Sequence, residues 1–288
     1  MKKEKLTINS LRATSRNLLK EAGIDSYSID TDVLLMHILD IDKNDLLTNL
    51  GRAVSEVHAD VFIKLINERC DNAPVQYLTG KCEFMSLEFD VDHNTLIPRP
   101  DTEILVETIL AAEKMENTNG LEIGVGSGCI SVSLECYADN IKMLGVDINP
   151  AAVAIASKNY ERILSRSGTF TASDLFDNVP RGTLFDFIVS NPPYIETLEI
   201  GRLDSTVKDF EPLLALDGGA DGLDFYRRIV DRAGEYLKDN GRVYFEIGYN
   251  QARAVKEILA AAGYVDIVIL DDYAGKNRVV KARRNEDV

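Results

Sequence analysis

The residues best suited to chemistry in this chain are Asn191-Pro192-Pro193-Tyr194, which directly follow an apolar run ending at Ser190. Proline fixes its own φ and holds the preceding residue extended, so Asn191 should sit in a nearly rigid loop. The Asn191 carboxamide oxygen and a proline carbonyl can accept both hydrogens of a planar NH₂ group, while the Tyr194 ring lies against its π face. The segment therefore predicts a site for an amino group conjugated to a π system: adenine N6, cytosine N4, or a glutamine or asparagine amide.

A glycine-rich turn precedes this loop in the chain. In Leu121-Glu122-Ile123-Gly124-Val125-Gly126-Ser127-Gly128 a predicted strand runs into alternate glycines and then a helix, where missing side chains let a ligand approach the backbone. A dinucleotide fingerprint would need glycine at position 129, which is Cys129. The spacing instead resembles the first motif of Rossmann-like S-adenosylmethionine methyltransferases. We therefore expect the cofactor to bind along this turn, at Glu122, Gly124, Val125, Gly126, Ser127 and Gly128.

Two acidic strand ends follow the glycine turn. Asp147 lies 19 residues after Gly128, at the end of an apolar run, and could accept both hydroxyl protons of a ribose. The alternative is that Asp147 caps the helix beginning near Asn149-Pro150. After the next strand, Asp174 could accept a hydrogen bond from the adenine amino group and Leu175 could cover the adenine ring. The alternative is that the two residues form an ordinary strand-end turn.

These motifs need a scaffold that brings strand ends together. The expected strands are Leu121–Val125, Met143–Val146, Phe185–Val189, Val243–Ile247 and Val265–Leu270, with a further strand before Ser173. The expected helices between them are Ala151–Leu164, Phe225–Leu237 and Ala252–Ala262. Alternating strands and helices indicate an α/β fold with a mostly parallel sheet, whose ligands lie at the carboxyl ends of the strands.

The first third of the chain has a different periodicity. Residues 6–70 show the spacing of short amphipathic helices, and from Phe84 the apolar residues alternate as in a half-buried strand. We expect a helical domain over residues 1–82 that recognises a substrate protein, a hairpin linker over 83–97, and the α/β domain over 98–288.

Composition and charge narrow the class of protein. The 288 residues are 45% hydrophobic and 27% charged, as in ordinary globular proteins, and carry a net charge of −15. Residues 1–84 carry −2 and residues 85–288 carry −13, so no basic surface for nucleic acid is predicted. The four cysteines have no CxxC spacing and the three histidines are scattered, so no metal site is expected. Neither a secretion signal nor a membrane span is visible, which favours the cytoplasm.

Nearly the whole chain resembles the release-factor glutamine methyltransferase family, which modifies the glutamine of the Gly-Gly-Gln tripeptide in class one peptide chain release factors. Besides the glycine turn and Asn191 to Tyr194, further segments match family motifs in family order. They are Pro74 to Gly80, Leu96 to Glu103, Asp209 to Pro212, Leu214 to Leu216, Gly218 to Leu223, Tyr226-Arg227, Glu246 to Gly248 with Gln251, and Ala274 to Val280.

The resemblance implies a seven-stranded, Rossmann-like methyltransferase domain behind a helical domain and a β-hairpin. It assigns cofactor binding to Gly124–Gly128, Asp147, Leu175 and Asn191. It assigns catalysis to Asn191, Pro192 and Tyr194, and glutamine binding to these residues with Pro193. Arg99 and Glu103 would line the inter-domain side of the site, unless they form a hinge ion-pair cluster. S-adenosylmethionine would be converted to S-adenosylhomocysteine without a metal, the partner would be a class one release factor, and the chain would be a monomer that binds neither nucleic acid nor membrane.

Three other functions compete with this prediction. A sister family methylates a glutamine of a ribosomal protein and has similar central motifs. Adenine-N6 DNA methyltransferases share the Asn-Pro-Pro-Tyr loop but would need a basic surface and a target-recognition domain. A cofactor-binding protein without turnover is the last, and an intact set of motifs argues against it.

Overall fold

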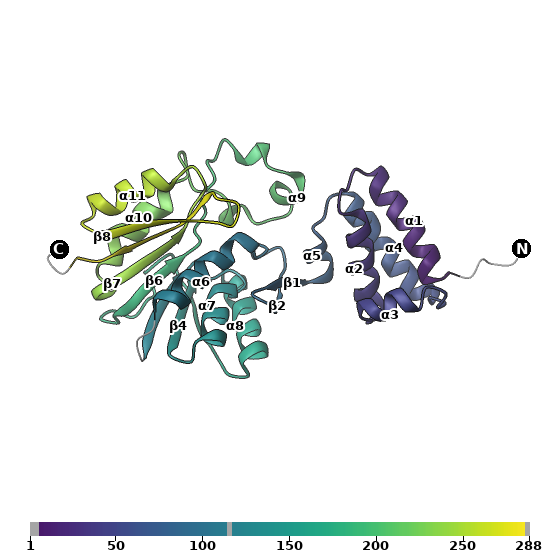
Figure 1. The fold of residues 1–288 in the computed structure, drawn as a ribbon, viewed down its shortest axis with the longest axis horizontal. Helices are drawn as coiled ribbons and strands as arrows, with labels where there is room; N and C mark the ends of the chain where they lie inside the picture. The colour runs from purple at the N-terminus through teal and green to yellow at the C-terminus, as the bar shows by residue number, and fades with distance from the viewer. Residues whose placement is uncertain (1–5, 114–116, 286–288) are drawn as a thin grey trace, which may run out of the picture. The chain divides into compact units, whose positions relative to one another are not determined.

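The computed structural model describes residues 6–113 and 117–285 (Figure 1). Within these residues the chain forms two compact units. The helical unit holds the described residues up to Lys81 together with Asp204–Phe210. The sheet unit holds the described residues of Cys82–Leu203 and those from Glu211 onward.

Short capped helices build the helical unit. Thr7 begins the first helix and accepts a hydrogen bond from the Ser10 N–H at 3.2 Å; Ser55 begins another and accepts from the His58 N–H at 3.2 Å. Leucine and isoleucine side chains from these helices enclose Phe62 in one buried core. The amphipathic helices expected in this region are therefore confirmed. They are α1 (Ile8–Glu21), α2 (Tyr27–Leu39), α3 (Lys43–Thr48), α4 (Glu56–Cys70) and α5 (Val75–Thr79), joined by α9 (Ser205–Lys208) from later in the chain.

A two-stranded hairpin follows, formed by β1 (Lys81–Phe84) and β2 (Leu87–Asp90). At its turn Met85 and Ser86 have φ values of 50° and 57°, the left-handed pair that suits the twist of a tight hairpin. The Met85 N–H donates to Glu103 Oε1 at 2.6 Å. Glu103 therefore holds the hairpin turn in place.

The sheet unit is built on a seven-stranded sheet with the order β5-β4-β3-β6-β7-β9-β8. The first five strands in this order, β5, β4, β3, β6 and β7, pair in parallel, whereas β9 pairs antiparallel with both β7 and β8. This arrangement confirms the predicted α/β fold with a mostly parallel sheet. The strands are β3 (Thr118–Ile123), β4 (Ile141–Asp147), β5 (Thr169–Ala172), β6 (Phe185–Ser190), β7 (Leu237–Glu246), β8 (Val265–Asp271) and β9 (Asn277–Arg283).

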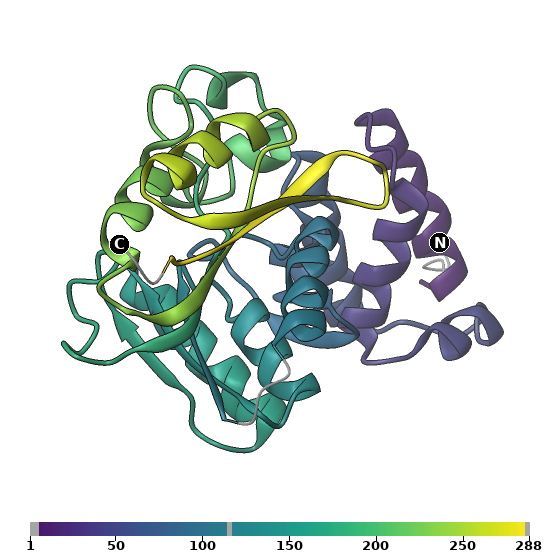
Figure 2. The same ribbon diagram turned by 60° about the vertical axis from the view of Figure 1, so that its left-hand side comes forward.

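Helices cover both faces of this sheet (Figures 1 and 2). Phe187 and Val189 of β6 face one buried cluster and Ile188 faces the other, because successive strand residues point to opposite sides. The first face is covered by α6 (Glu103–Ala112), α7 (Cys129–Tyr137) and α8 (Pro150–Leu164). The second is covered by α10 (Asp224–Ala233) and α11 (Ala252–Ala261). Both faces being buried explains why the central strands read as continuous apolar runs.

Two parts of the sequence prediction need correction. The helix expected over Phe225–Leu237 is wrong at its carboxyl end, because α10 ends at Ala233 and Leu237 already pairs with Phe185 as the first residue of β7. No long apolar run signalled β9, because basic residues flank its adjacent buried valines, Val279 and Val280, on both sides. Within the described residues, no helix combines the length and the apolar character needed to cross a membrane.

Candidate active site

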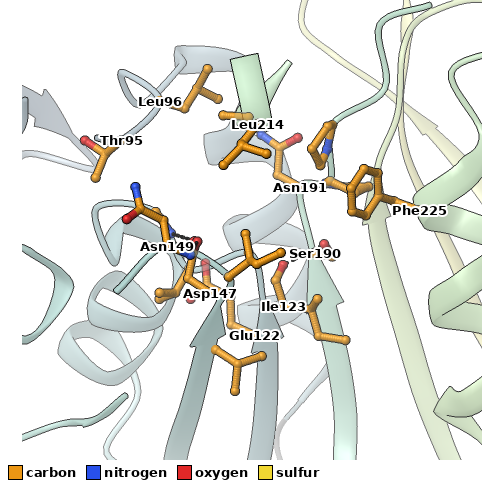
Figure 3. Close-up of a pocket in the computed structure, with 18 of the residues that line it drawn as sticks. Thr95, Leu96, Glu122, Ile123, Asp147, Asn149, Ser190, Asn191, Leu214 and Phe225 are labelled. Carbon is orange, nitrogen blue, oxygen red and sulfur yellow. Dashed lines mark hydrogen bonds between the residues drawn. The ribbon is translucent and has the colours of Figure 1, made fainter. Parts of the chain in front are cut away.

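A cavity of the sheet unit opens where β3, β4 and β6 end at their carboxyl edge (Figure 3). Side chains from sequence-distant segments surround it, among them Asp147, Asn191 and Phe225. The structure brings most of the predicted site residues to this cavity: Arg99, Glu122, Gly124, Val125, Gly126, Ser127, Asp147, Asp174, Leu175, Asn191, Pro192 and Pro193. Gly128, Tyr194 and Glu103, in contrast, are not among its lining residues.

The glycine turn owes its shape to backbone conformations that favour glycine. Gly124 and Gly126 have φ values of 79° and 53°, and a Cβ on either would meet no atom within 4 Å, so both face open space. Gly128 has a φ of 82°, and a Cβ there would lie 3.1 Å from the Ala156 Cβ. Gly124 and Gly126 thus keep the cavity wall free of side chains, whereas Gly128 allows α7 and α8 to approach closely.

Several backbone N–H groups of this turn already form hydrogen bonds within the protein. The Gly124 and Val125 N–H groups donate to the Val146 carbonyl at 2.8 and 3.0 Å, and the Gly126 N–H donates to Asp147 Oδ2 at 2.9 Å. These bonds tie the turn to the end of β4. They define the wall against which a ligand would lie, rather than leaving all the amides free for it.

Glu122 is buried at the end of β3 and holds the first turn of α7. Its carboxyl accepts from the Ser131 N–H at 2.9 Å and from the Ser131 hydroxyl. Burial raises its pKa to about 8, although both bonds from Ser131 lower it. Glu122, which is among the residues lining the cavity, is therefore predominantly protonated at neutral pH.

Asp147 ends β4 with its carboxylate at the cavity. Its oxygens accept backbone N–H bonds from Gly126 and Asn149, each at 2.9 Å. Burial raises its pKa, and these two bonds oppose that rise. The helix cap considered as an alternative belongs to a neighbour: Asn149 Oδ1 accepts from the Ala151 N–H at 3.0 Å at the start of α8. Asp147 is therefore not needed as that cap.

The turn after β5 holds Leu175 in an unusual conformation. Leu175 has a φ of 49°, which is uncommon for a bulky side chain and marks local strain. Ser173 stabilises the turn: its N–H donates to the Asp147 carbonyl at 2.8 Å and its hydroxyl donates to the Leu175 carbonyl at 2.9 Å. The result is an apolar side chain presented to the cavity. The neighbouring Asp174 binds Arg228 of α10 at 2.8 and 2.9 Å, so its carboxylate already has a partner.

Asn191 follows β6 with its carboxamide at the cavity. Its Nδ2 donates to the Thr102 hydroxyl oxygen at 3.3 Å. The residue before it, Ser190, is buried and its hydroxyl donates to the Ile123 carbonyl at 2.7 Å, which links the ends of β6 and β3. The loop therefore starts from a fixed point beside the glycine turn.

Gln251, which opens α11, clamps the loop after Tyr194. Its Nε2 donates to the carbonyls of Tyr194 at 2.9 Å and Gly222 at 3.1 Å, and its Oε1 accepts from the Gly248 N–H at 3.0 Å. Burial raises the pKa of the Tyr194 hydroxyl, whose aromatic ring packs against the core. From the sequence, Gln251 and Gly222 are identifiable only as motif positions. Their contacts with this loop join residues that are far apart in the chain.

Arg99 and Glu103 take different positions. Arg99 lines the cavity and forms an ion pair with Glu211, whose side chain is 1% exposed. Burial raises the pKa of Glu211 and the Arg99 guanidinium opposes that rise. Glu103 instead binds the hairpin turn, as described above.

Part of the cavity wall is apolar. Leu96, Ile148, Leu214, Ala215 and Phe225 line the cavity alongside the polar groups. Leu96, Leu214 and Ala215 belong to motif segments that the sequence singled out, whereas Ile148 and Phe225 do not. Only the fold reveals that all five surround one space.

Two family models match the chain, the PrmC N-terminal domain over residues 10–80 and the methyltransferase small domain over residues 99–207. The release factor glutamine methyltransferase of Clostridium acetobutylicum is 40% identical, covering 93% of this chain and 95% of its own. That of Geobacter sulfurreducens is 39% identical over 98% of both chains. The catalytic domain of hMettl16 shares the fold, with a TM-score of 0.58 and 18% identity over 83% of this chain and 87% of its own. Identity of this extent along nearly the full length shows that the chain belongs to the release factor glutamine methyltransferase family.

Proposed function

We propose that this chain transfers a methyl group from S-adenosylmethionine to the side-chain amide nitrogen (N5) of the glutamine in the Gly-Gly-Gln segment of a class one release factor. The observation that carries the proposal is the position of Asn191, Pro192 and Pro193. They line the same cavity as the glycine turn and Asp147. An amide-binding group therefore stands beside a wall suited to a nucleoside.

The cavity fits S-adenosylmethionine in its chemistry. Asp147 offers carboxylate lone pairs that its two backbone bonds leave available to ribose hydroxyls. Leu175 and Ile148 supply apolar surface suited to an adenine ring. Gly124 and Gly126 leave open space where a side chain would otherwise project. Arg228 already donates to both oxygens of the Asp174 carboxylate. If Asp174 also accepts a hydrogen bond from the adenine amino group, it must do so while it is paired with that arginine.

The protein's contribution to the reaction is to hold a poor nucleophile in line. S-adenosylmethionine, when bound, supplies a methyl group on a positively charged sulfur. Asn191 Oδ1 and a proline carbonyl accept the two N–H bonds of the substrate amide, which helps its nitrogen to become pyramidal. Positioning of this kind can lower a barrier by up to ~7–11 kcal/mol in the best cases. No general base is needed in advance, because the amide nitrogen carries a positive charge once it has taken up the methyl group, and in that state it readily loses a proton to water.

Transfer of labelled methyl tests the proposal. The substrates are a purified class one release factor, its Gln→Ala variant in Gly-Gly-Gln, the glutamine-bearing ribosomal protein, and duplex DNA. Label on the wild-type factor alone is the expected result. Label on the ribosomal protein or on DNA instead would mean that this molecule, and not the release factor, is the substrate. No label on any of the four would reject methyl transfer to all of them.

An Asn191→Ala variant tests the site itself. We expect turnover to fall by roughly 10²-fold or more, because the substrate amide loses an acceptor that orients it. Cofactor affinity, measured by calorimetry, should change much less. Full turnover by this variant would refute the role assigned to Asn191.

A further inference from the structure

The Asn191 carboxamide has a donor end and an acceptor end, and the proposed reaction needs the acceptor end to face the substrate. Asn191 Nδ2 donates to the Thr102 hydroxyl oxygen at 3.3 Å. Hydrogen bonds from Asn191 and Thr102 also reach the carboxyl group of Glu246. With its NH₂ group engaged by these two residues, Asn191 keeps Oδ1 available as an acceptor.

Thr102 lies at the start of a helix, where a threonine hydroxyl usually caps the helix. It occupies the N-cap position of α6, after the short 3₁₀ turn Pro100–Thr102, and is 2% exposed. An N-cap threonine normally accepts a bond from the first turn of its helix. Among the described residues, Thr102 makes no such side-chain bond. Its hydroxyl is instead directed to Asn191 and Glu246.

Glu246 lies behind Asn191 rather than in the cavity. It is the last residue of β7, 1% exposed, and is not among the residues that line the cavity. Within the described part of the chain, its Oε2 has no hydrogen-bond partner. A buried carboxyl group with an unsatisfied oxygen costs stability, so its presence here calls for a functional explanation.

Both positively and negatively charged groups lie near the Glu246 carboxyl group. Arg278 lies close enough to favour its charged form, but also binds Asp101 at 2.9 Å and Asp272 at 3.1 Å. The Tyr226 hydroxyl donates to the backbone carbonyl of Glu246 at 2.8 Å. Burial raises the pKa values of Tyr194, Tyr226 and Cys129, and the Glu246 charge adds to that rise. Burial is the largest influence and raises the pKa of Glu246 to about 7. The carboxylate can only accept hydrogen bonds, whereas the protonated acid can also donate one and compete for the same partners.

We propose that Glu246 and Thr102 are positioning residues that fix the Asn191 carboxamide with its NH₂ group inward and its oxygen toward the substrate amide. This inference rests on the proposed function, because it assigns a direction to an amide-binding group. It adds two residues that act through Asn191: Glu246, which does not line the cavity, and Thr102, whose hydroxyl is bonded to Asn191 at the cavity wall.

Variants at Thr102 and Glu246 test the proposal through methyl transfer to the release factor. Thr102→Val removes the hydroxyl at nearly constant shape and should lower kcat roughly 10²-fold, since small misplacements of a reacting group have effects of that size. Thr102→Ser restores the hydroxyl and should recover most of the activity. Glu246→Leu should resemble Thr102→Val. Cofactor affinity should stay within about threefold of the wild type in each.

The pH profile separates positioning from a merely structural role. For the wild type, kcat/KM should rise with pH through about 7 as Glu246 becomes the acceptor-only carboxylate. Glu246→Gln keeps one acceptor oxygen but does not titrate, so it should retain partial activity with that rise absent. Glu113→Gln is the matched control: Glu113 is 4% exposed and binds Arg242 and Tyr244, away from Asn191. It should lose stability but keep the wild-type pH profile.

Three outcomes would overturn the proposal: wild-type kcat in Thr102→Val and Glu246→Leu, a wild-type pH profile in Glu246→Gln, or loss of cofactor affinity in parallel with activity. Exchange of the Asn191 side-chain amide protons, followed by NMR, gives a readout that does not depend on the substrate. Thr102→Val should accelerate that exchange, and unchanged exchange would count against the proposal. If the wild type methylates no release factor, the proposed function fails while this readout still decides the orientation.

Discussion

At the scale of single residues, Glu122 links the protonation of the site to stability. Its folded pKa of about 8 lies above the value of about 4.3 for an unfolded chain, so the folded state binds the extra proton between these values. Stability from this group is complete at low pH and is lost as pH rises through about 8. Glu122→Gln is neutral throughout and should escape that loss. Because the loss accumulates between these two pKa values, we expect the unfolding temperatures of the two proteins to diverge steadily as pH rises toward 8 and to run in parallel above it.

Calorimetry from about pH 5 to pH 9 measures this difference, because the Glu122 contribution changes between the unfolded and the folded pKa. Other groups that titrate in the range are common to both proteins, so the comparison isolates Glu122. Glu246 has a folded pKa of about 7 and completes most of its titration below the upper part of the range. Parallel unfolding curves for the variant and the wild type over the whole of this range would mean that Glu122 is already ionised when folded.

Asp147 should contribute mainly to cofactor affinity. Hydrogen bonds to a charged group are worth about 1.5–3 kcal/mol, so Asp147→Ala should raise the Kd for S-adenosylmethionine roughly 10- to 100-fold. Asp186→Ala is a matched control, because the Asp186 carboxylate also accepts a backbone N–H, from Asn119 at 2.8 Å, but does not line the cavity. Calorimetric titration of both variants measures the affinities. Equal losses of affinity would point to a general structural effect.

Residue types and spacing predicted much of the polar site, because a glycine turn, an acidic strand end and an Asn-Pro-Pro segment all occur next to strands. They could not predict that the Asp174 carboxylate binds Arg228, or that Glu103 holds the Met85 turn. Each of these contacts joins parts of the chain separated by many residues. Their formation depends on packing that local patterns do not contain.

At the scale of elements, the loop after β6 depends on close packing against a glycine segment. A Cβ at Gly222 would lie 2.6 Å from Gln251 Nε2 and closer still to the Tyr194 carbonyl oxygen, and its φ is 71°. Gly222→Ala should therefore displace the Asn191-to-Tyr194 loop and reduce kcat roughly 10²-fold. Gly182→Ala is the control, since Gly182 has a φ of 80° with nothing within 4 Å of a Cβ.

Gly182→Ala should lose about 1–2 kcal/mol of stability, because it places a side chain on a left-handed residue. Gly222→Ala should lose more, because its Cβ also overlaps the Tyr194 carbonyl oxygen. Thermal unfolding gives that loss and methyl transfer gives the effect on kcat. The prediction fails if Gly182→Ala loses as much turnover as Gly222→Ala, because the backbone conformation alone would then explain the result.

The elements themselves were predictable where their period was strong. Strands buried on both faces read as apolar runs, and the helices between them had clear spacing. The exceptions have physical causes. In β9 basic residues flank a pair of adjacent valines, which makes the apolar run too short to notice. The helical spacing through Tyr236 and Leu237 continues beyond the real end of α10. Tyr236 and Leu237 are buried for a different reason, since they begin the pairing with β6.

At the scale of the whole molecule, the stability of the helical unit rests partly on one buried ion pair. Arg69 Nε binds Asp30 Oδ2 at 2.7 Å, with side chains 10% and 6% exposed, and the Ser26 hydroxyl donates to the same oxygen. Arg69→Met leaves the Asp30 carboxylate buried without its partner and should cost about 3–5 kcal/mol. Lys64→Ala, which breaks the exposed pair with Glu68, should cost roughly 0.5 kcal/mol or less. Denaturant unfolding of both variants measures the two free energies.

The same variant tests whether Asp204–Phe210 unfolds with the helical unit, to which it belongs by its contacts. The Val207 and Lys208 N–H groups both donate to the Asp204 carbonyl at 3.0 Å, in a helix too short to protect them alone. In hydrogen exchange, these amides should lose protection in Arg69→Met together with those of α4. Amides of β3 and β6 should keep theirs, because they belong to the sheet unit. Loss at α4 with unchanged protection at Val207 would show that α9 is stabilised independently.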